Sequence, residues 1–177
     1  MLKTLRRFLK ANRGLAAVEF AFVAPVMVVM FYGAIEIVEA VDCKVRVSDM
    51  ASTTADLVAQ SVAVSTTDIN NIFGASNAIL FPYPSGGTKI VVSSLVDNGH
   101  GGATVAWSEA QNTTKRTQGS TVAVPAGLIV SGSGGSVILA EITYTYNSPT
   151  TKFLSSAMTM TGTFYSKPRR SVVVKHT

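Results

Sequence analysis

The sequence is poor in the residues that catalytic and metal sites use. Its single cysteine, Cys43, excludes an intrachain disulfide and any site built from several cysteines. Its two histidines, His100 in a glycine-rich turn and His176 near the C-terminus, do not form a recognisable metal-binding pattern. Asp97 and Ser94 near His100 lack the context of a nucleophile, and no glycine-rich phosphate-binding motif occurs. We therefore expect no catalytic residue, metal or cofactor.

Charge is also scarce, and it is unevenly placed. Charged residues make up 14% of the chain, which has a formal net charge of +5. Residues 1–14 contain five basic residues and no acidic one, whereas the remaining 163 residues contain ten of each sign. The basic character thus belongs to a short N-terminal segment. This distribution excludes a global phosphate-binding surface, and we expect no nucleic-acid partner.

The longest apolar run covers residues 15–35 and contains one charge, Glu19. About 20 apolar residues are enough for a helix to span the hydrocarbon of a bilayer. The basic residues before this run and the acidic residues after it predict residues 1–14 in the cytoplasm and the bulk of the chain outside. A cleavable secretory signal and a plain signal anchor are alternative interpretations. A secretory signal typically has an apolar core shorter than this run. A plain signal anchor explains the length of the run but leaves Glu19 unexplained.

Glu19 suggests a specific use for the run. A carboxylate within a span is costly, so it is a candidate functional residue whose partner should be sought. If the chain is cut after Gly14, the new N-terminus at Leu15 carries an ammonium group one helical turn before Glu19. The ammonium of one subunit and the carboxylate of its neighbour can then compensate each other when helices pack side by side. Gly14 suits peptidase binding because it has no Cβ.

The residues around this position carry a resemblance. The basic leader, Gly14, and the string LAAVEFAFVAP from Leu15 to Pro25 resemble the type IV prepilins, and more narrowly the TadE/TadG-like minor pilins (pseudopilins) of the tight-adherence (Flp) pilus system. The strand-like SVILAEITYTY and the ending FYSKPRR also resemble that family, although Lys167 stands where arginine is more common.

The resemblance implies a structural protein of pilus biogenesis and not an enzyme. It implies cleavage between Gly14 and Leu15 by a prepilin peptidase, and subunit assembly through Glu19 and Phe20. The expected partners are that peptidase, other pilins and pseudopilins, the inner-membrane assembly platform and membrane lipid. We expect a single-pass protein of the bacterial inner membrane with a periplasmic head, and the extracellular pilus is an alternative location. An uncleaved membrane-anchored assembly factor and a signal-anchored binding or adhesion module remain alternatives.

Residues 36–60 continue the helix, because they lack glycine and proline and their apolar residues recur at helical spacing. Charged residues in the first half of this segment predict a solvated face; they are Glu36, Glu39, Asp42, Lys44 and Arg46. Asp42 and Arg46 form a favourable i,i+4 pair. Pro25 predicts a local kink, and residues 52–54 predict a weak point that can interrupt the helix.

Residues 61–177 are expected to form an α+β head, so that the fold is a long N-terminal transmembrane and amphipathic helix packed on a small antiparallel sheet, as in pilins. A cap cluster at residues 65–68 predicts a short helix over about 67–80. Beyond it the pattern alternates with period two, and Asn98-Gly99 predicts a hairpin. The expected strands are 89–96, 103–107, 120–124, 137–146 and 157–165.

Three further residues or segments allow two interpretations each. Glu141 interrupts an apolar strand. In one interpretation its carboxylate faces an edge or is hydrogen-bonded, and in the other it forms a salt bridge that fixes the packing of the head. Cys43 is either a small buried helix residue or a site of intermolecular disulfide formation. The basic C-terminal residues are either a solvated terminus or a surface for an acidic partner or phospholipid.

Overall fold

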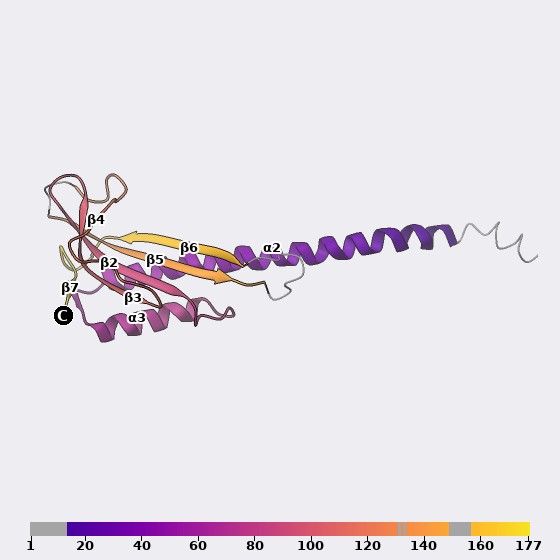
Figure 1. Ribbon diagram of the computed structural model, residues 1–177, viewed down its shortest axis with the longest axis horizontal. Coiled ribbons are helices and arrows are strands. Elements are labelled where there is room, and N and C mark those ends of the chain that lie inside the picture. The colour runs from indigo at the N-terminus through magenta and orange to yellow at the C-terminus, as the bar shows by residue number, and fades with distance from the viewer. Residues whose placement is uncertain (1–13, 131, 133, 149–156) are drawn as a thin grey trace, which may run out of the picture.

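The computed structural model describes residues 14–148, except 131 and 133, and residues 157–177. Its dominant element is α2 (Leu15–Ala59), a helix of 45 residues whose second half is covered by the head and whose first half projects away from it (Figure 1). The predicted leader, residues 1–14, lies outside the described residues except for Gly14. The α+β arrangement expected from the sequence, with a long N-terminal helix against an antiparallel sheet, is confirmed.

The sheet has five strands in the order β4-β3-β2-β5-β6, and all neighbouring pairs are antiparallel. The strands are β2 (Lys89–Asp97), β3 (Ala103–Gln111), β4 (Thr121–Val122), β5 (Ser136–Tyr146) and β6 (Met158–Ser166). The hairpin predicted at Asn98-Gly99 joins β2 to β3, and the register shifts between Ser94 and Leu95. Each predicted strand is therefore present, with bounds that differ by a few residues.

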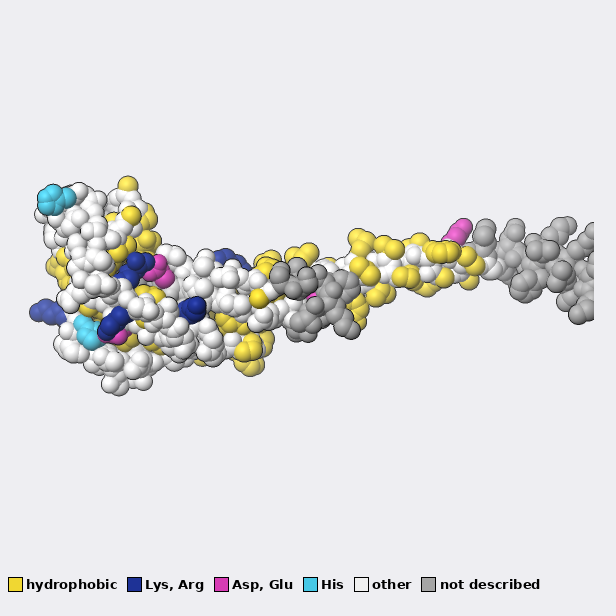
Figure 2. All heavy atoms as spheres, in the orientation of Figure 1, with side chains coloured by type: hydrophobic (Ala, Val, Ile, Leu, Met, Phe, Trp, Pro, Cys, Tyr) yellow, Lys and Arg dark blue, Asp and Glu magenta, His cyan; other side chains and the backbone are white. Residues whose placement is uncertain are grey.

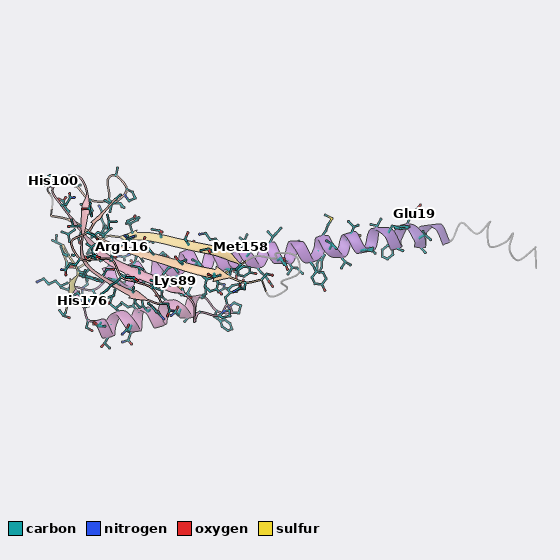
Figure 3. All side chains as sticks on the ribbon, viewed as in Figure 1. Glu19, Lys89, His100, Arg116, Met158 and His176 are labelled. Atoms are coloured by element: carbon teal, nitrogen blue, oxygen red, sulfur yellow. The ribbon has the colours of Figure 1, made fainter. Side chains whose placement is uncertain are left out.

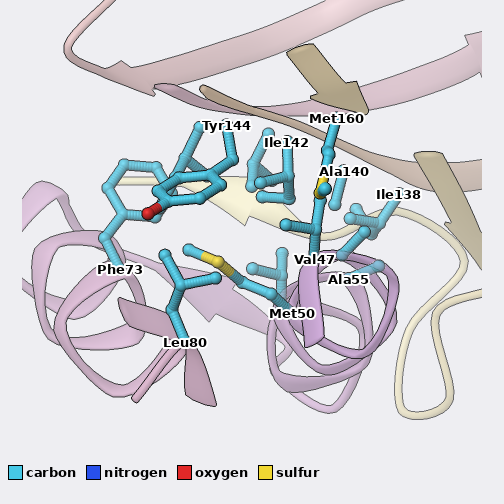
Figure 4. Packing of buried hydrophobic residues seen from close by; sticks show 14 of the residues in the cluster. Val47, Met50, Ala55, Phe73, Leu80, Ile138, Ala140, Ile142, Tyr144 and Met160 are labelled. Carbon is cyan, nitrogen blue, oxygen red and sulfur yellow. The ribbon is translucent and has the colours of Figure 1, made fainter. Parts of the chain in front are cut away.

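One face of the sheet packs against α2 and the shorter helix α3 (Thr66–Ile79). The main core lies between them, and Figure 4 shows side chains from both helices meeting those of β5 and β6. The predicted alternation on β5 is confirmed, because its inward-facing side chains are buried; they are Ile138, Ala140, Ile142, Tyr144 and Tyr146. A smaller apolar cluster, which includes Leu95 and Leu139, lies apart from this core.

Helix α3 begins where the sequence predicts. The Ser65 hydroxyl accepts a hydrogen bond from the Asp68 backbone N–H, and the Asp68 carboxylate accepts one from the Ser65 N–H. This capping box satisfies two donors that the first turn of a helix would otherwise leave unpaired. The same contacts lower the pKa of Asp68, chiefly through the Ser65 backbone N–H.

The interruption predicted at residues 52–54 does not occur, since α2 continues unbroken to Ala59. The Thr54 hydroxyl donates to the Met50 carbonyl at 2.6 Å and lies 2.7 Å from the Ser76 hydroxyl of α3. Thr54 and Ser76 are both fully buried. Packing of α2 between α3 and the sheet thus outweighs the modest helix propensity of this segment, as tertiary contacts commonly do.

A second, two-stranded sheet was missed in the sequence. Strand β1 (Ala63–Val64) pairs in parallel with β7 (Lys175–His176). The C-terminal segment is also held by Trp107, whose indole N–H donates to the Val174 carbonyl at 2.7 Å, and Val174 is fully buried. Two-residue strands carry too little periodicity to be recognised from sequence, although the apolar SVVV before β7 indicates burial.

Candidate assembly surface on the projecting helix

The first half of α2 is an uncovered apolar helix. It is long and apolar enough to cross a membrane, and only 6% of its most apolar 18-residue window is buried. Large side chains project outward along it, with Phe22 77%, Met30 70% and Phe20 68% exposed. Figure 2 shows apolar side chains along the projecting half of the helix. A surface of this kind requires lipid or another apolar helix around it, because water would leave it unfavourably exposed.

The predicted cleavage site lies where this helix starts. Gly14 is the N-cap of α2, is exposed, and makes no side-chain cap. A Cβ at Gly14 would meet no atom within 4 Å, so the local fold does not itself require glycine here. The Gly14–Leu15 bond thus lies at the end of the helix farthest from the head (Figure 1). A peptidase can approach this bond without disturbing the packed head.

Glu19 lies one helical turn into α2, far from the head (Figure 3). It is exposed, as is its neighbour Phe20. Among the described residues, Glu19 takes part in no ion pair. Its position four residues after Leu15 corresponds to about 6 Å along the helix axis. Within the part of the chain that the structure describes, the Glu19 carboxylate is therefore exposed and has no ion-pair partner.

Pro25 lies inside α2, which is continuous on both sides of it. Proline has no N–H to donate to the carbonyl four residues earlier, so one backbone hydrogen bond of the helix is absent. The kink at Pro25 stays a prediction.

The face of α2 that meets the head differs from the sequence interpretation. Glu36 is only 1% exposed, whereas Ile37 and Val41 are 62% and 58% exposed. The prediction that Glu36 belongs to a solvated face is therefore wrong. The reason is that the head covers the row through Glu36, Ala40, Cys43 and Val47, and this row includes the acid.

Asp42 and Arg46 form the predicted i,i+4 ion pair, with Arg46 Nε 2.7 Å from Asp42 Oδ2. The Tyr83 hydroxyl lies 3.2 Å from the same carboxylate and donates to the Glu39 carbonyl at 2.9 Å. The Arg46 hydrogen bond lowers the pKa of Asp42. Burial, together with the negative charge of Asp42, raises the pKa of Tyr83 to about 12. This group ties the loop after α3 to the helix just beyond the predicted span.

Cys43 is fully buried, as the first of its two interpretations requires. Burial raises the pKa of its thiol to about 11. An inaccessible neutral thiol is a poor nucleophile, so the structure disfavours the intermolecular disulfide.

Glu141 forms the salt bridge that was one of its two interpretations. Arg116 Nη2 lies 2.7 Å from each carboxylate oxygen, and Nε lies 3.0 Å from Oε2. The pair links the segment after β3 to β5 across the face of the sheet opposite the helices.

The remaining sequence candidates are scattered over the head. His100 lies at a loop tip and His176 at another edge (Figure 3). No group of metal-ligating side chains occurs in the part of the chain that the structure describes. Ser94 is buried, and His100 Nδ1 faces the Asn98 carbonyl, so these residues do not form a triad. Arg169 in the basic ending pairs with Asp56 of α2, and its N–H donates to the Ala59 carbonyl.

Comparison with known proteins supports the interpretation of the helix. A family model described as TadE-like protein matches residues 14–56, which cover α2 from its N-cap almost to its last turn. No curated protein and no solved structure matches the chain significantly.

Proposed function

We propose that this chain is a minor pilin-like structural subunit of a tight-adherence pilus system, because its residues 14–56 match the TadE-like family model, and that family is associated with the biogenesis of such pili. In this proposal a prepilin peptidase cuts after Gly14, and the processed chain assembles with other pilins and pseudopilins through the projecting half of α2. The inner-membrane assembly platform and membrane lipid are its other partners.

The observation that carries the proposal is the division of α2 into two halves. The second half completes the core of the head, while the first half remains uncovered and apolar. One continuous helix therefore connects a folded head to a surface suited to both lipid and neighbouring helices. A head that needed only a tether would not require its anchor to continue as the central helix of its core.

Glu19 has a defined place in this mechanism. After cleavage the Leu15 ammonium lies one turn from Glu19, and parallel neighbouring helices shifted by about 6 Å bring one chain's ammonium to the other's carboxylate. Two charges that are each costly in an apolar bundle become tolerable as a pair. The pairing sets the axial register of the subunits.

Processing can be tested directly. The full chain is co-expressed with a prepilin peptidase and an inactive form of that enzyme, and intact mass and N-terminal peptides are measured. We expect the mature chain to begin at Leu15 only with the active peptidase. A chain that still begins at Met1 would favour the uncleaved assembly factor, and a cut near Ala40 would favour a secreted binding module. Either result contradicts the proposal.

A further inference from the structure

In the segment of α2 that joins the span to the head, an acidic side chain is buried while neighbouring aliphatic side chains are exposed. Glu36 is 1% exposed, while Ile37 and Val38, the next two residues, are 62% and 67% exposed. Val41, one turn later, is also largely exposed. A helix on the surface of a water-soluble head would present its acids and cover its aliphatic side chains. Here the opposite arrangement holds over two turns.

Two of the three acids of this segment, Glu36 and Glu39, turn carboxylate oxygens into the head. Glu36 Oε1 accepts a hydrogen bond from the buried Ser148 hydroxyl at 3.2 Å. The Oε2 atoms of Glu36 and Glu39 are also buried. Asp42 is held by Arg46 and Tyr83. Of the three carboxylates that follow the apolar run, Glu36 is therefore buried by the head, Glu39 has one buried oxygen, and Asp42 is 46% exposed but paired with Arg46.

Apolar side chains of the head flank α2 at the same level. Met158 at the start of β6 lines a groove of about 510 Å³ together with Ile37, Val41 and Val45, and Figure 3 shows it at the base of the head beside α2. Phe81 is 77% exposed and lies two residues before Tyr83, whose hydroxyl reaches the Glu39 carbonyl. Among the described residues, the base of the head therefore has exposed apolar side chains both on the helix and on the segments beside it.

We propose that the base of the head is seated in the lipid, with the hydrocarbon of the bilayer extending along α2 from about Phe20 to about Val41. This inference rests on the membrane-spanning placement in the proposed function. Those 22 residues span about 33 Å, close to the hydrocarbon thickness of about 30 Å. The sequence alone places the outer boundary at Ile35, because Glu36 and Glu39 follow it.

With the boundary near Val41, the charged residues Glu19 and Lys44 lie at the two interfaces of the bilayer and outside its hydrocarbon. Glu19 lies at the opposite interface, where a carboxylate costs less than in the hydrocarbon. Lys44, the first cation along α2, lies at the level of the outer headgroups, where lysine is favourable. Glu19 then needs an ammonium partner only when the helix leaves the lipid for a bundle of subunits.

Lipid accounts for this surface better than one partner helix does. Ile37 and Val38 are adjacent and point about 100° apart around α2, and Met158 and Phe81 extend the surface on two other elements. A single packed helix covers a narrower stripe. The outward side of α2 becomes polar after Val45, with exposed Ser48 and Asp49, as a surface leaving the membrane would.

Spin-label depth measurements test the placement in the full chain. Single cysteines at Val38, Val41 and Phe81 are labelled, and the chain is reconstituted at low protein density in phosphatidylethanolamine–phosphatidylglycerol vesicles. Phe31→Cys is the control within the span, and Val172→Cys, at a position 69% exposed on the head, is the aqueous control. The native Cys43 stays unlabelled because it is fully buried. Power saturation then compares access of oxygen with access of a water-soluble nickel chelate.

We expect the ratio of oxygen to nickel access at positions 38, 41 and 81 to resemble that at 31 and to exceed that at 172 severalfold. Ratios like that at 172 would overturn the inference and return the boundary to Ile35. Low access of both reagents at 38 and 41 would also overturn it, because it would indicate cover by a second chain. High nickel access at 31 would instead contradict the span itself, and with it the proposed function.

Discussion

Gly162 of β6 lies directly against the backbone of Val47 in α2. A Cβ at Gly162 would stand 2.6 Å from the Val47 carbonyl oxygen and 3.2 Å from the Ala51 Cβ. Glycine is therefore required at this crossing by the close approach of a strand to a helix. The contact joins an edge strand of the sheet to the helix whose first half is long and apolar enough to cross a membrane, so it couples the head to the projecting half of α2.

Replacing Gly162 with alanine should separate β6 from α2. We expect Gly162→Ala to lower the free energy of unfolding by about 1–3 kcal/mol, the usual cost of overpacking. Gly74→Ala is the matched control, because a Cβ at Gly74 in α3 meets no atom within 4 Å, and alanine in a helix gains up to about 1 kcal/mol over glycine. Denaturant unfolding in detergent, followed by circular dichroism, measures both. Equal stability of the two variants would show that the crossing tolerates a side chain.

Removing the charge of Glu19 should affect assembly and not processing. Glu19→Gln keeps the shape of the side chain but leaves a neighbouring ammonium uncompensated, so we expect at least about a tenfold loss of incorporation into the pilus fraction. Cleavage after Gly14 should be unchanged by intact mass. Asp49→Asn, at an exposed acid on the polar part of α2, is the control and should incorporate normally. Normal incorporation of Glu19→Gln would remove the pairing role.

The ion pair between Arg116 and Glu141 should contribute modestly to stability. Both side chains are partly exposed, at 36% and 31%, so we expect Glu141→Gln to cost about 1 kcal/mol or less despite the bidentate geometry. The difference from wild type should shrink in about 1 M salt, which screens partly exposed charges. Lys115→Met breaks the pair with Glu109, in which the lysine is 59% exposed, and should have almost no effect. An effect of Glu141→Gln that persists in high salt would indicate that packing, and not charge, is responsible.

The thiol of Cys43 should make the free energy of unfolding decrease with rising pH in the alkaline range. Its pKa is raised from 9.0 to about 11 by burial, so the unfolded chain loses this proton at lower pH than the folded chain does. The stabilisation is complete below pH 9 and decreases as pH rises towards 11, by about 2 kcal/mol over that range. Unfolding of wild type and Cys43→Ala between pH 8 and 11 gives the contribution as the difference in slope. Parallel curves would contradict the raised pKa.

Much of the fold could be predicted because its signals are local. The change from helical spacing to alternation predicted the five strands, and the Ser65–Asp68 cap predicted the start of α3 within one residue. At the projecting helix, Gly14 and Glu19 were predicted from residue type and spacing and Phe20 from the family resemblance, and their roles stay predictions. Ile37 shows where such reasoning fails, because it and the buried Glu36 both fit a regular helix and only the position of the head distinguishes their faces.

The sequence by itself determined the apolar length of α2, the glycine before it, the acid one turn within it, and the order of helix and strands in the head. These follow from composition and period along a continuous stretch of chain. Only the tertiary structure decided that Glu36 turns inward, that Gly162 touches Val47, and that the C-terminal residues pair with Ala63 and Val64. The physical reason is that each depends on which distant segment covers a surface, and burial of a side chain is a property of its neighbours in space.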